Sequence, residues 1–286
     1  MMKQFGLIGH PVSYSLSPLM HNTAFSLLGL DCTYQAYDVG PTELGNALRD
    51  FRTRGFAGLN VTIPHKETIL GFLDTVETEA SAIGAVNAIA FDGDRLIGHN
   101  TDAYGVRKSI EPFQAEIAGS TVLLLGAGGA SRAVSYALLK HFSPRELIIA
   151  SRSEQRAEHL SVRCKALSAG TKITTMGLAA DSMKEMIERS RLIINATPVG
   201  MTPSVDHSPL PHDVAFRRGQ IALDLIYTPL ETKFLKTASS RGARTISGLE
   251  MFIYQGARSF EIWTGREMPI AGVRPILEQR LKTHDT

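Results

Sequence analysis

Two serines near the start of the chain have the type and spacing of an anion-binding pair. Ser15 and Ser17 alternate within the string YSLSP, so both side chains face the same way if this segment is extended. Ser17 is also a natural N-cap, and Pro18 a natural first helical residue. Two hydroxyls at a helix N-terminus would bind a carboxylate, although simple helix capping explains the same residues.

A lysine follows the next cluster of polar residues, in the string NVTIPHK. Asn60 and Thr62 alternate with apolar residues and therefore share one face at the end of a predicted strand. We expect Pro64 to begin a helix that carries Lys66 on its first turn. A cation is disfavoured near a helix N-terminus, so this placement suggests a functional role for Lys66. The alternative is that Lys66, like most lysines, is a solvated surface residue.

An amide and a carboxylate complete the polar set. Asn87 begins a predicted strand within GAVNA, and Asp102 closes a predicted hairpin within NTD. Asn and Asp at such positions are ordinarily turn formers. Four polar clusters at strand ends of one open sheet nevertheless match the place where such folds bind ligands.

A glycine-rich turn in the string TVLLLGAGGASRAVSYAL predicts a dinucleotide site. Gly126, Gly128 and Gly129 stand between an apolar strand and a helix, with the small residue Ser131 at the third position of the motif. Gly126 permits a tight turn, and Gly128 lets the backbone approach a pyrophosphate at the helix N-terminus. The alternative is a strand-to-helix turn that binds no ligand.

The end of the next strand indicates which nucleotide is preferred. An enzyme that uses NAD would place an acid here, whereas this strand runs into Ser151, Arg152 and Ser153, with Arg156 beyond. Arg152 and the hydroxyls would bind a 2′-phosphate through charge-assisted hydrogen bonds. Glu154 is expected in the first turn of the following helix, where acids are common. NADP is therefore favoured, with a solvated Arg152 as the alternative.

Two series of alternating strands and helices position these residues. In the first part we expect strands at 5–8, 33–39, 58–62 and 86–91, a hairpin joining 88–91 to 96–99, and helices at 18–28, 42–53 and 64–73. In the second part we expect strands at 121–125, 146–150, 172–176, 192–196, 221–225 and 243–246, and helices at 131–140, 154–166, 182–188 and 231–240. The pattern predicts an α/β protein with an N-terminal, mostly parallel α/β domain and a doubly wound Rossmann-type domain.

Two helices at 249–264 and 273–281 follow without a strand between them. We expect them to return to the first domain. The prediction is a substrate-binding domain of residues 1–103 and 249–286, and an NADP-binding domain of residues 104–248.

Composition excludes several classes of partner. The 286 residues carry 30 basic and 28 acidic side chains, a net charge of +2, and no block of like charge. We therefore expect a small-molecule partner, with no nucleic acid, membrane or metal bound. Cys32 and Cys164 form no CxxC pair, and the N-terminus lacks the apolar region of a signal peptide, so we expect a cytoplasmic protein.

Eight strings occur in the order and approximate spacing of one family. They are GHPVSYSLSPLMHN, NVTIPHK, GAVNA, NTDAYG, GAGGAS, NATPVGM, DLIYTP and GLEMFIYQGA, and they run from residue 9 to residue 257. With them the chain resembles the shikimate dehydrogenase family. The resemblance implies an enzyme, monomeric or homodimeric, that reduces 3-dehydroshikimate to shikimate with NADPH, a step towards aromatic amino acids.

The resemblance also implies roles for individual residues. Lys66 and Asp102 would be the catalytic pair, attracting each other by about 4 kcal/mol at about 4 Å and an effective dielectric of about 20. Which of them is the formal acid stays open. The other substrate-binding positions would be Ser15, Ser17, Thr62, Asn87, Tyr227 and Gln255. The NADP-binding positions would be Gly126, Ala127, Gly128, Gly129, Ala130, Ser151, Arg152, Ser153 and Arg156, with Thr197, Gly248 and Met251 near the nicotinamide.

Three alternatives accompany this prediction. Quinate/shikimate dehydrogenases that use NAD tend to carry Thr or Gly in place of the second serine and an acid after the second nucleotide-domain strand, where this chain has Ser17 and Arg152. A non-catalytic NADP-binding regulator would have lost Lys66 or Asp102, and both are present. A specialised enzyme such as an amino-shikimate dehydrogenase is the third alternative.

Overall fold

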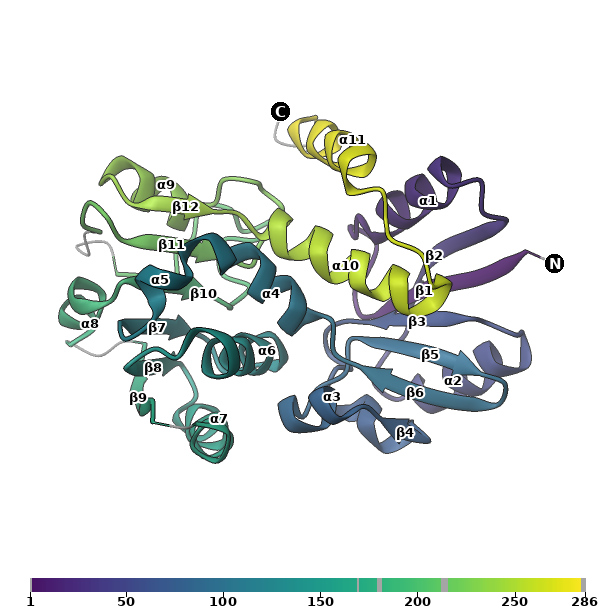
Figure 1. Ribbon diagram of the computed structural model, residues 1–286, viewed down its shortest axis with the longest axis horizontal. Helices are drawn as coiled ribbons and strands as arrows, with labels where there is room; N and C mark the ends of the chain where they lie inside the picture. Colours follow the sequence, from purple (N-terminus) through teal and green to yellow (C-terminus); the bar gives the residue numbers. More distant parts are fainter. Residues whose placement is uncertain (1, 169, 179–181, 212–215, 284–286) are drawn as a thin grey trace. The chain divides into compact units, whose positions relative to one another are not determined.

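The computed structural model describes residues 2–168, 170–178, 182–211 and 216–283, and they form two compact units. The N-terminal unit contains the residues up to Gly105 and those from Ile253 onward, and the central unit contains Val106–Phe252. Both boundaries fall inside helices, namely α4 (Asp102–Ile110) and α10 (Gly248–Thr264) (Figure 1).

A mixed six-stranded sheet forms the centre of the N-terminal unit, in the order β2-β1-β3-β5-β6-β4. Its strands are β1 (Lys3–Gly9), β2 (Cys32–Asp38), β3 (Gly58–Val61), β4 (Thr75–Val76), β5 (Ala88–Asp92) and β6 (Arg95–His99). The pairs β1–β2, β1–β3 and β4–β6 are parallel, and β5 runs antiparallel to β3 and β6. The predicted hairpin is confirmed, because Asp92 pairs with Arg95 across a two-residue loop.

The helices of this part of the chain agree only partly with the prediction. They are α1 (Ser17–Leu27), α2 (Leu44–Thr53), a 3₁₀ helix (Thr68–Phe72) and α3 (Thr78–Ile83). The helix expected at 64–73 is wrong, since residues 64–67 form turns and only Thr68–Phe72 is helical. The carbonyl of Lys66 accepts the backbone N–H of Val86 at 2.8 Å, so this segment is tied to a distant part of the chain instead of starting a helix.

The central unit has a fully parallel sheet in the order β12-β11-β10-β7-β8-β9. Its strands are β7 (Thr121–Leu125), β8 (Glu146–Ser151), β9 (Lys172–Gly177), β10 (Leu192–Asn195), β11 (Ile221–Asp224) and β12 (Arg244–Ile246). This is the doubly wound Rossmann order, so the predicted fold is confirmed. Its helical segments are a 3₁₀ turn (Glu111–Phe113), α5 (Gln114–Ile117), α6 (Gly129–Ala137) with a π turn (Leu138–Phe142), α7 (Glu154–Leu167), α8 (Met183–Arg189) and α9 (Lys233–Ser240).

Apolar residues of the central sheet are buried on both faces. Val122 and Leu124 belong to one hydrophobic cluster, whereas the alternate residues Leu123 and Leu125 belong to another. Side chains alternate along a strand, so a parallel strand covered by helices on both sides needs an unbroken apolar run. For this reason the apolar run TVLLL could be predicted as a strand from the sequence.

The C-terminal helices return to the N-terminal unit, as expected. The residues of α10 from Ile253 onward and α11 (Ile270–Lys282) belong to that unit. The indole nitrogen of Trp263 in α10 donates to the carbonyl of Ile89 in β5 at 2.9 Å. A Cβ on Gly58 would lie 2.3 Å from the Trp263 Nε1 atom, so only glycine permits this close approach.

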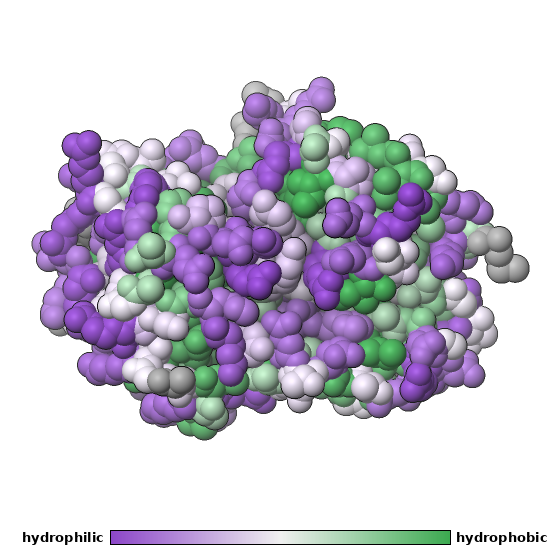
Figure 2. Space-filling model, in the orientation of Figure 1, coloured by the Kyte–Doolittle hydropathy of each residue, from purple (hydrophilic) through white to green (hydrophobic). Residues whose placement is uncertain are grey.

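Polar side chains predominate on the visible face of the molecule, with apolar residues in scattered patches between them (Figure 2). Among the helices of the described residues, none combines the length and apolar character needed to cross a membrane.

Candidate active site

A buried ion pair lies at the centre of the polar residues of the N-terminal unit. The Nζ atom of Lys66 lies 2.5 Å from Oδ2 of Asp102, and the two side chains are only 16% and 4% exposed. Asp102 is the first residue of α4, where the helix dipole stabilises a carboxylate. An ammonium group has three N–H donors, so Lys66 can hold Asp102 with one of them and present another to a ligand.

Asn87 holds the other oxygen of the carboxylate. Its amide nitrogen donates to Oδ1 of Asp102 and to Oγ1 of Thr101, both at 2.9 Å. Its amide oxygen accepts the backbone N–H of Thr101 at 2.6 Å. The same amide nitrogen lies 3.3 Å from Oε1 of Gln255 in α10. The structure therefore brings together four predicted site residues, namely Lys66, Asn87, Asp102 and Gln255. The first and the last of them are 189 positions apart in the sequence.

The two predicted serines lie at the start of α1, but they do not cap it. The helix begins at Ser17, and the N-cap position falls on Leu16, so the predicted helix start is wrong by one residue. Ser15 accepts the backbone N–H of Ser17 at 3.2 Å and donates to its hydroxyl at 3.1 Å. Because no backbone group of the helix uses the Ser17 hydroxyl as its cap, the pair stays suited to an anionic ligand.

Thr62 follows β3 and is half-buried. Its backbone N–H donates to the carbonyl of Ile8 at 2.9 Å, which holds the residue beside the end of β1. A Cβ on Gly9 would lie 2.4 Å from the Thr62 methyl group. Thr62 therefore lies at the carboxyl ends of two neighbouring parallel strands, the edge at which open sheets bind ligands.

Buried polar residues surround Asn87; Asn60 belongs to a polar cluster that the sequence indicated, whereas Tyr34 and Ser259 do not. Asn60 donates to the carbonyl of Asn87 at 3.1 Å and to the hydroxyl of Ser259 at 3.0 Å, and it accepts the hydroxyl of Tyr34 at 2.8 Å. Ser259 lies 3.0 Å from the Thr101 hydroxyl. For Ser259, the available sequence signal was its spacing of four from Gln255 within the expected helix. This spacing places Ser259 on the same helix face as a predicted site residue.

The glycine turn of the central unit has the geometry of an anion site. Gly126 has a φ of +112°, and a Cβ there would lie 3.0 Å from the carbonyl oxygen of Ala196. Gly128 occupies the N-cap of α6, and a Cβ on it would have no neighbour within 4 Å. The helix N-terminus therefore offers backbone N–H groups to an anion through open space, with Gly129 and Ala130 in its first turn.

The predicted 2′-phosphate residues form the turn between β8 and α7. Ser153 is the N-cap of α7, where its hydroxyl accepts the backbone N–H of Arg156 at 3.3 Å. Ser151 accepts the backbone N–H of Ser153 at 3.2 Å. Arg152 and Arg156 are exposed, and Glu154 lies in the first turn of α7 as expected. The turn therefore presents two guanidinium groups to solvent beside the half-buried Ser153, whereas Ser151 is buried.

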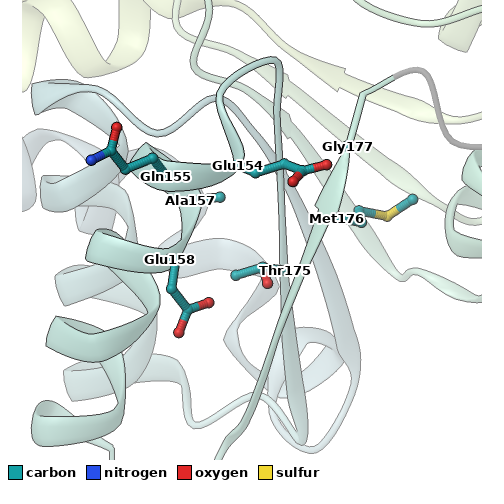
Figure 3. Close-up of a pocket in the computed structure, with 7 residues that line it drawn as sticks. All are labelled: Glu154, Gln155, Ala157, Glu158, Thr175, Met176 and Gly177. Carbon is teal, nitrogen blue, oxygen red and sulfur yellow. The ribbon is translucent and has the colours of Figure 1, made fainter.

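A cavity of about 420 Å³ lies beside this turn, between α7 and β9 (Figure 3). Its lining consists of Glu154, Gln155, Ala157, Glu158, Thr175, Met176 and Gly177. Two carboxylates would repel a phosphate, so the cavity does not suit the anionic part of a nucleotide. The phosphate-binding assignment stays with the Ser151–Ser153 turn.

The loops that follow β10 and β11 are held by a buried carboxylate. The amide of Asn195 accepts the backbone N–H and the hydroxyl of Thr197, at 3.0 and 2.7 Å, and donates to Asp224 at 3.0 Å. Asp224 also accepts the hydroxyl of Thr232 at 2.6 Å. Burial raises the pKa of Asp224 to about 6, although its hydrogen bonds oppose this effect. Thr197 is thus held in a defined position.

Three further predicted residues belong to the central unit. A Cβ on Gly248 would lie 2.4 Å from the carbonyl oxygen of Leu225, so close packing of α10 requires glycine there. Met251 is 7% exposed within the hydrophobic core. The ring of Tyr227 packs on Phe252 with a centroid distance of 4.4 Å.

Metal ligands do not cluster in the parts of the chain that the structure describes, where no three His, Cys, Asp or Glu side chains form a group that could hold an ion.

Family models match three stretches of the chain. Residues 7–89 match the shikimate dehydrogenase substrate binding domain, and residues 248–278 match the shikimate 5′-dehydrogenase C-terminal domain. Residues 122–205 match the saccharopine dehydrogenase NADP binding domain.

Whole-chain similarity extends over nearly the full length. A shikimate dehydrogenase (NADP⁺) from Moorella thermoacetica is 45% identical over 276 residues, which cover 96% of this chain and 92% of the relative. A solved shikimate dehydrogenase in complex with NADP⁺ is 39% identical, with a TM-score of 0.88 over 98% of this chain and 96% of the other. The shikimate 5-dehydrogenase from Thermus thermophilus, solved with NADP(H) and shikimate, is 37% identical, with a TM-score of 0.84 over 97% and 99%.

Proposed function

The chain belongs to the shikimate dehydrogenase family, and we propose that it catalyses the NADPH-dependent, reversible reduction of 3-dehydroshikimate to shikimate. This oxidoreductase step lies in the shikimate pathway, which leads to chorismate and the aromatic amino acids. The observation that carries the proposal is the buried pair of Lys66 and Asp102, 2.5 Å apart, on a unit that matches the family's substrate-binding domain.

We assign the two ligands to different units. The N-terminal unit, residues 1–103 with 249–286 in the predicted division, would bind the substrate, and residues 104–248 would bind NADP. The turn from Gly126 to Ala130 suits a pyrophosphate because of its positive φ, its open backbone and the helix N-terminus behind it. Ser151, Arg152, Ser153 and Arg156 would bind the 2′-phosphate, and Thr197, Gly248 and Met251 would lie near the nicotinamide.

The chain's own residues would supply binding, orientation and a proton. When bound, NADPH supplies the hydride. Lys66 would polarise the ring carbonyl and donate a proton from Nζ to its oxygen. Asp102 would stabilise the ammonium group before transfer, and Asn87 would keep the carboxylate in place through Oδ1. Because both charged side chains are largely removed from solvent, their attraction is screened less than that of a surface pair.

Recognition of the substrate would use uncharged polar groups. Ser15, Ser17 and Tyr227 would bind the carboxylate, since hydroxyl donors satisfy its oxygens. Thr62, Asn87 and Gln255 would bind the ring hydroxyls. We also propose a cytoplasmic enzyme, because the thiols of Cys32 and Cys164 are free.

The alternatives have less support. A dehydrogenase for quinate with NAD would favour an acid where Arg152 stands, and three curated relatives that are 41–45% identical to this chain are named as NADP⁺ enzymes. A non-catalytic regulator would have no need for the intact Lys66–Asp102 pair.

Steady-state rates with shikimate and with quinate, each with NADP⁺ and with NAD⁺, test the proposal directly. We expect the highest kcat/KM for shikimate with NADP⁺. Activity on quinate alone would overturn the substrate assignment, and absence of activity in all four combinations would favour the regulator.

A further inference from the structure

Ser259 connects three separate segments of the N-terminal unit through one hydroxyl group. It lies in α10 and is 0% exposed. Its Oγ atom is 3.0 Å from Nδ2 of Asn60 in β3, 3.0 Å from Oγ1 of Thr101 before α4, and 3.1 Å from the carbonyl oxygen of Gln255. Thr101 and Asn60 are 1% and 5% exposed, so bulk solvent does not reach these bonds.

The proton positions in this group follow from counting donors and acceptors. A hydroxyl has one proton and two lone pairs. Ser259 accepts from the Asn60 amide, which can only donate through nitrogen, and it gives its own proton to the Gln255 carbonyl, which can only accept. Its second lone pair must therefore accept the proton of Thr101. Oγ1 of Thr101 is then left with lone pairs for the Asn87 amide.

The orientation of Asn87 is set by the Thr101 backbone N–H, which its oxygen accepts, and by the Asp102 carboxylate, which its nitrogen holds; a Thr101 proton directed at Ser259 matches this orientation. One hydrogen of its amide nitrogen goes to Thr101 and the other to Oδ1 of Asp102. If the Thr101 proton pointed at Asn87 instead, the two donors would face each other, and the amide would have to turn its oxygen towards the Asp102 carboxylate. Such an oxygen would repel the carboxylate rather than hold it.

We propose that Ser259 is a positioning residue for the reaction: its hydroxyl turns the proton of Thr101 away from Asn87, which leaves Oγ1 of Thr101 as an acceptor for the Asn87 amide and so supports the bond by which Asn87 holds Asp102. This inference rests on the proposed dehydrogenase function. Ser259 itself would touch neither substrate nor cofactor. Its hydrogen bond to the Gln255 carbonyl also fixes the turn of α10 that carries the Gln255 side chain.

The test compares Ser259→Ala with the wild type in shikimate oxidation by NADP⁺. We expect kcat to fall about tenfold, while the KM for NADP⁺ stays within about twofold, because the cofactor residues lie in the other unit. Ser190→Ala is the matched control, since Ser190 is also buried and also donates to the carbonyl four residues earlier, in α8. Its kcat should equal that of the wild type.

A double-mutant cycle separates positioning from a purely structural role. Thr101→Val removes the hydroxyl through which Ser259 is proposed to act, whereas Thr101→Ser keeps it and should retain most of the activity. Adding Ser259→Ala to Thr101→Val should lower kcat by less than about twofold further. Additive losses would overturn the inference, and so would a Ser259→Ala enzyme with wild-type kcat.

Two other outcomes are decisive as well. If Ser259→Ala does not fold, Ser259→Cys replaces it, because the thiol is a weak donor and acceptor of similar size, and unchanged kcat there would contradict positioning. A folded wild type that is inactive on shikimate would instead refute the proposed function, before any variant is compared.

Discussion

His21 provides a test of how burial shapes the pH dependence of folding. Its ring lies on α1, is completely buried, and stacks on Tyr34 with a centroid distance of 4.4 Å. Neither ring nitrogen has a hydrogen-bond partner among the described residues. Burial lowers the pKa of His21 from 6.5 to about 3, since a protonated ring would be a charge among aromatic side chains.

The free energy of unfolding should therefore fall on acidification. The unfolded chain takes up a proton on His21 below its ordinary pKa of 6.5, whereas the folded chain does not until about pH 3. The stabilising contribution is present above pH 6.5 and is lost progressively as the pH falls towards 3. Between about pH 7.5 and about pH 5 the loss amounts to roughly 2 kcal/mol, at about 1.36 kcal/mol per pH unit.

His21→Phe removes the titrating group and keeps a flat ring. Urea unfolding followed by the fluorescence of Trp263, the single tryptophan of the chain, reports on the same aromatic cluster, since its ring lies 5.4 Å from His21. We expect the wild type to lose about 2 kcal/mol more than the variant between about pH 7.5 and about pH 5.

Phe25→Leu serves as the control, because it alters the same cluster but keeps His21. Its free energy of unfolding should be displaced by the same amount at each pH, parallel to the wild type. If His21→Phe loses as much stability as the wild type over this range, the buried ring does not govern the pH dependence, and the reasoning from burial is refuted.

Three further predictions concern the two sites. Lys66→Ala should lower kcat by roughly 10³-fold while fluorescence titration shows unchanged NADPH binding, and near-normal turnover would remove Lys66 from proton transfer. Arg152→Ala should raise the KM for NADP⁺ about tenfold but leave that for NAD⁺ unchanged, whereas Arg163→Ala, an exposed change on α7, should alter neither; equal effects on both nucleotides would contradict a 2′-phosphate contact. Burial raises the pKa of Asp224 from 3.8 to about 6, so its stabilising contribution is complete below pH 3.8 and is lost as the pH rises through 6, about 3 kcal/mol in all. Hydrogen exchange of central-unit amides should show this loss in the wild type but not in Asp224→Asn, and identical pH profiles would refute it.

Local patterns were sufficient for most of the central unit. Residues 122–125 of the run TVLLL are all apolar because both faces of β7 are covered. Gly126 comes next because its φ of +112° is a conformation that residues with a Cβ rarely adopt. These causes act within a few residues along the chain. Strand, turn and helix could therefore be predicted together, with boundaries that differ by no more than three residues.

Local patterns were insufficient around Lys66. The string IPHKE suggests a helix start, yet residues 64–67 form turns because the Lys66 carbonyl binds Val86, twenty residues later. The short strand β4 and helix α3, between Thr75 and Ile83, were missed for a related reason. Two-residue β4 exists only because β6 lies beside it, and no periodic pattern can arise in so short a segment.

The sequence by itself determined the chemical types at the site: the glycine turn, the arginine in place of an acid, and a lysine and an aspartate in recognisable motifs. Only the tertiary structure decided which of these groups meet. Lys66 and Asp102 are 36 positions apart in the chain, and their 2.5 Å contact depends on the sheet whose strands β3 and β6 precede them. Ser259 is the clearest case, since a serine in an amphipathic helix has no distinctive pattern of its own. Its importance lies in the donors that Asn60 and Thr101 bring to it, because hydrogen bonds act over about 3 Å of space and not along the sequence.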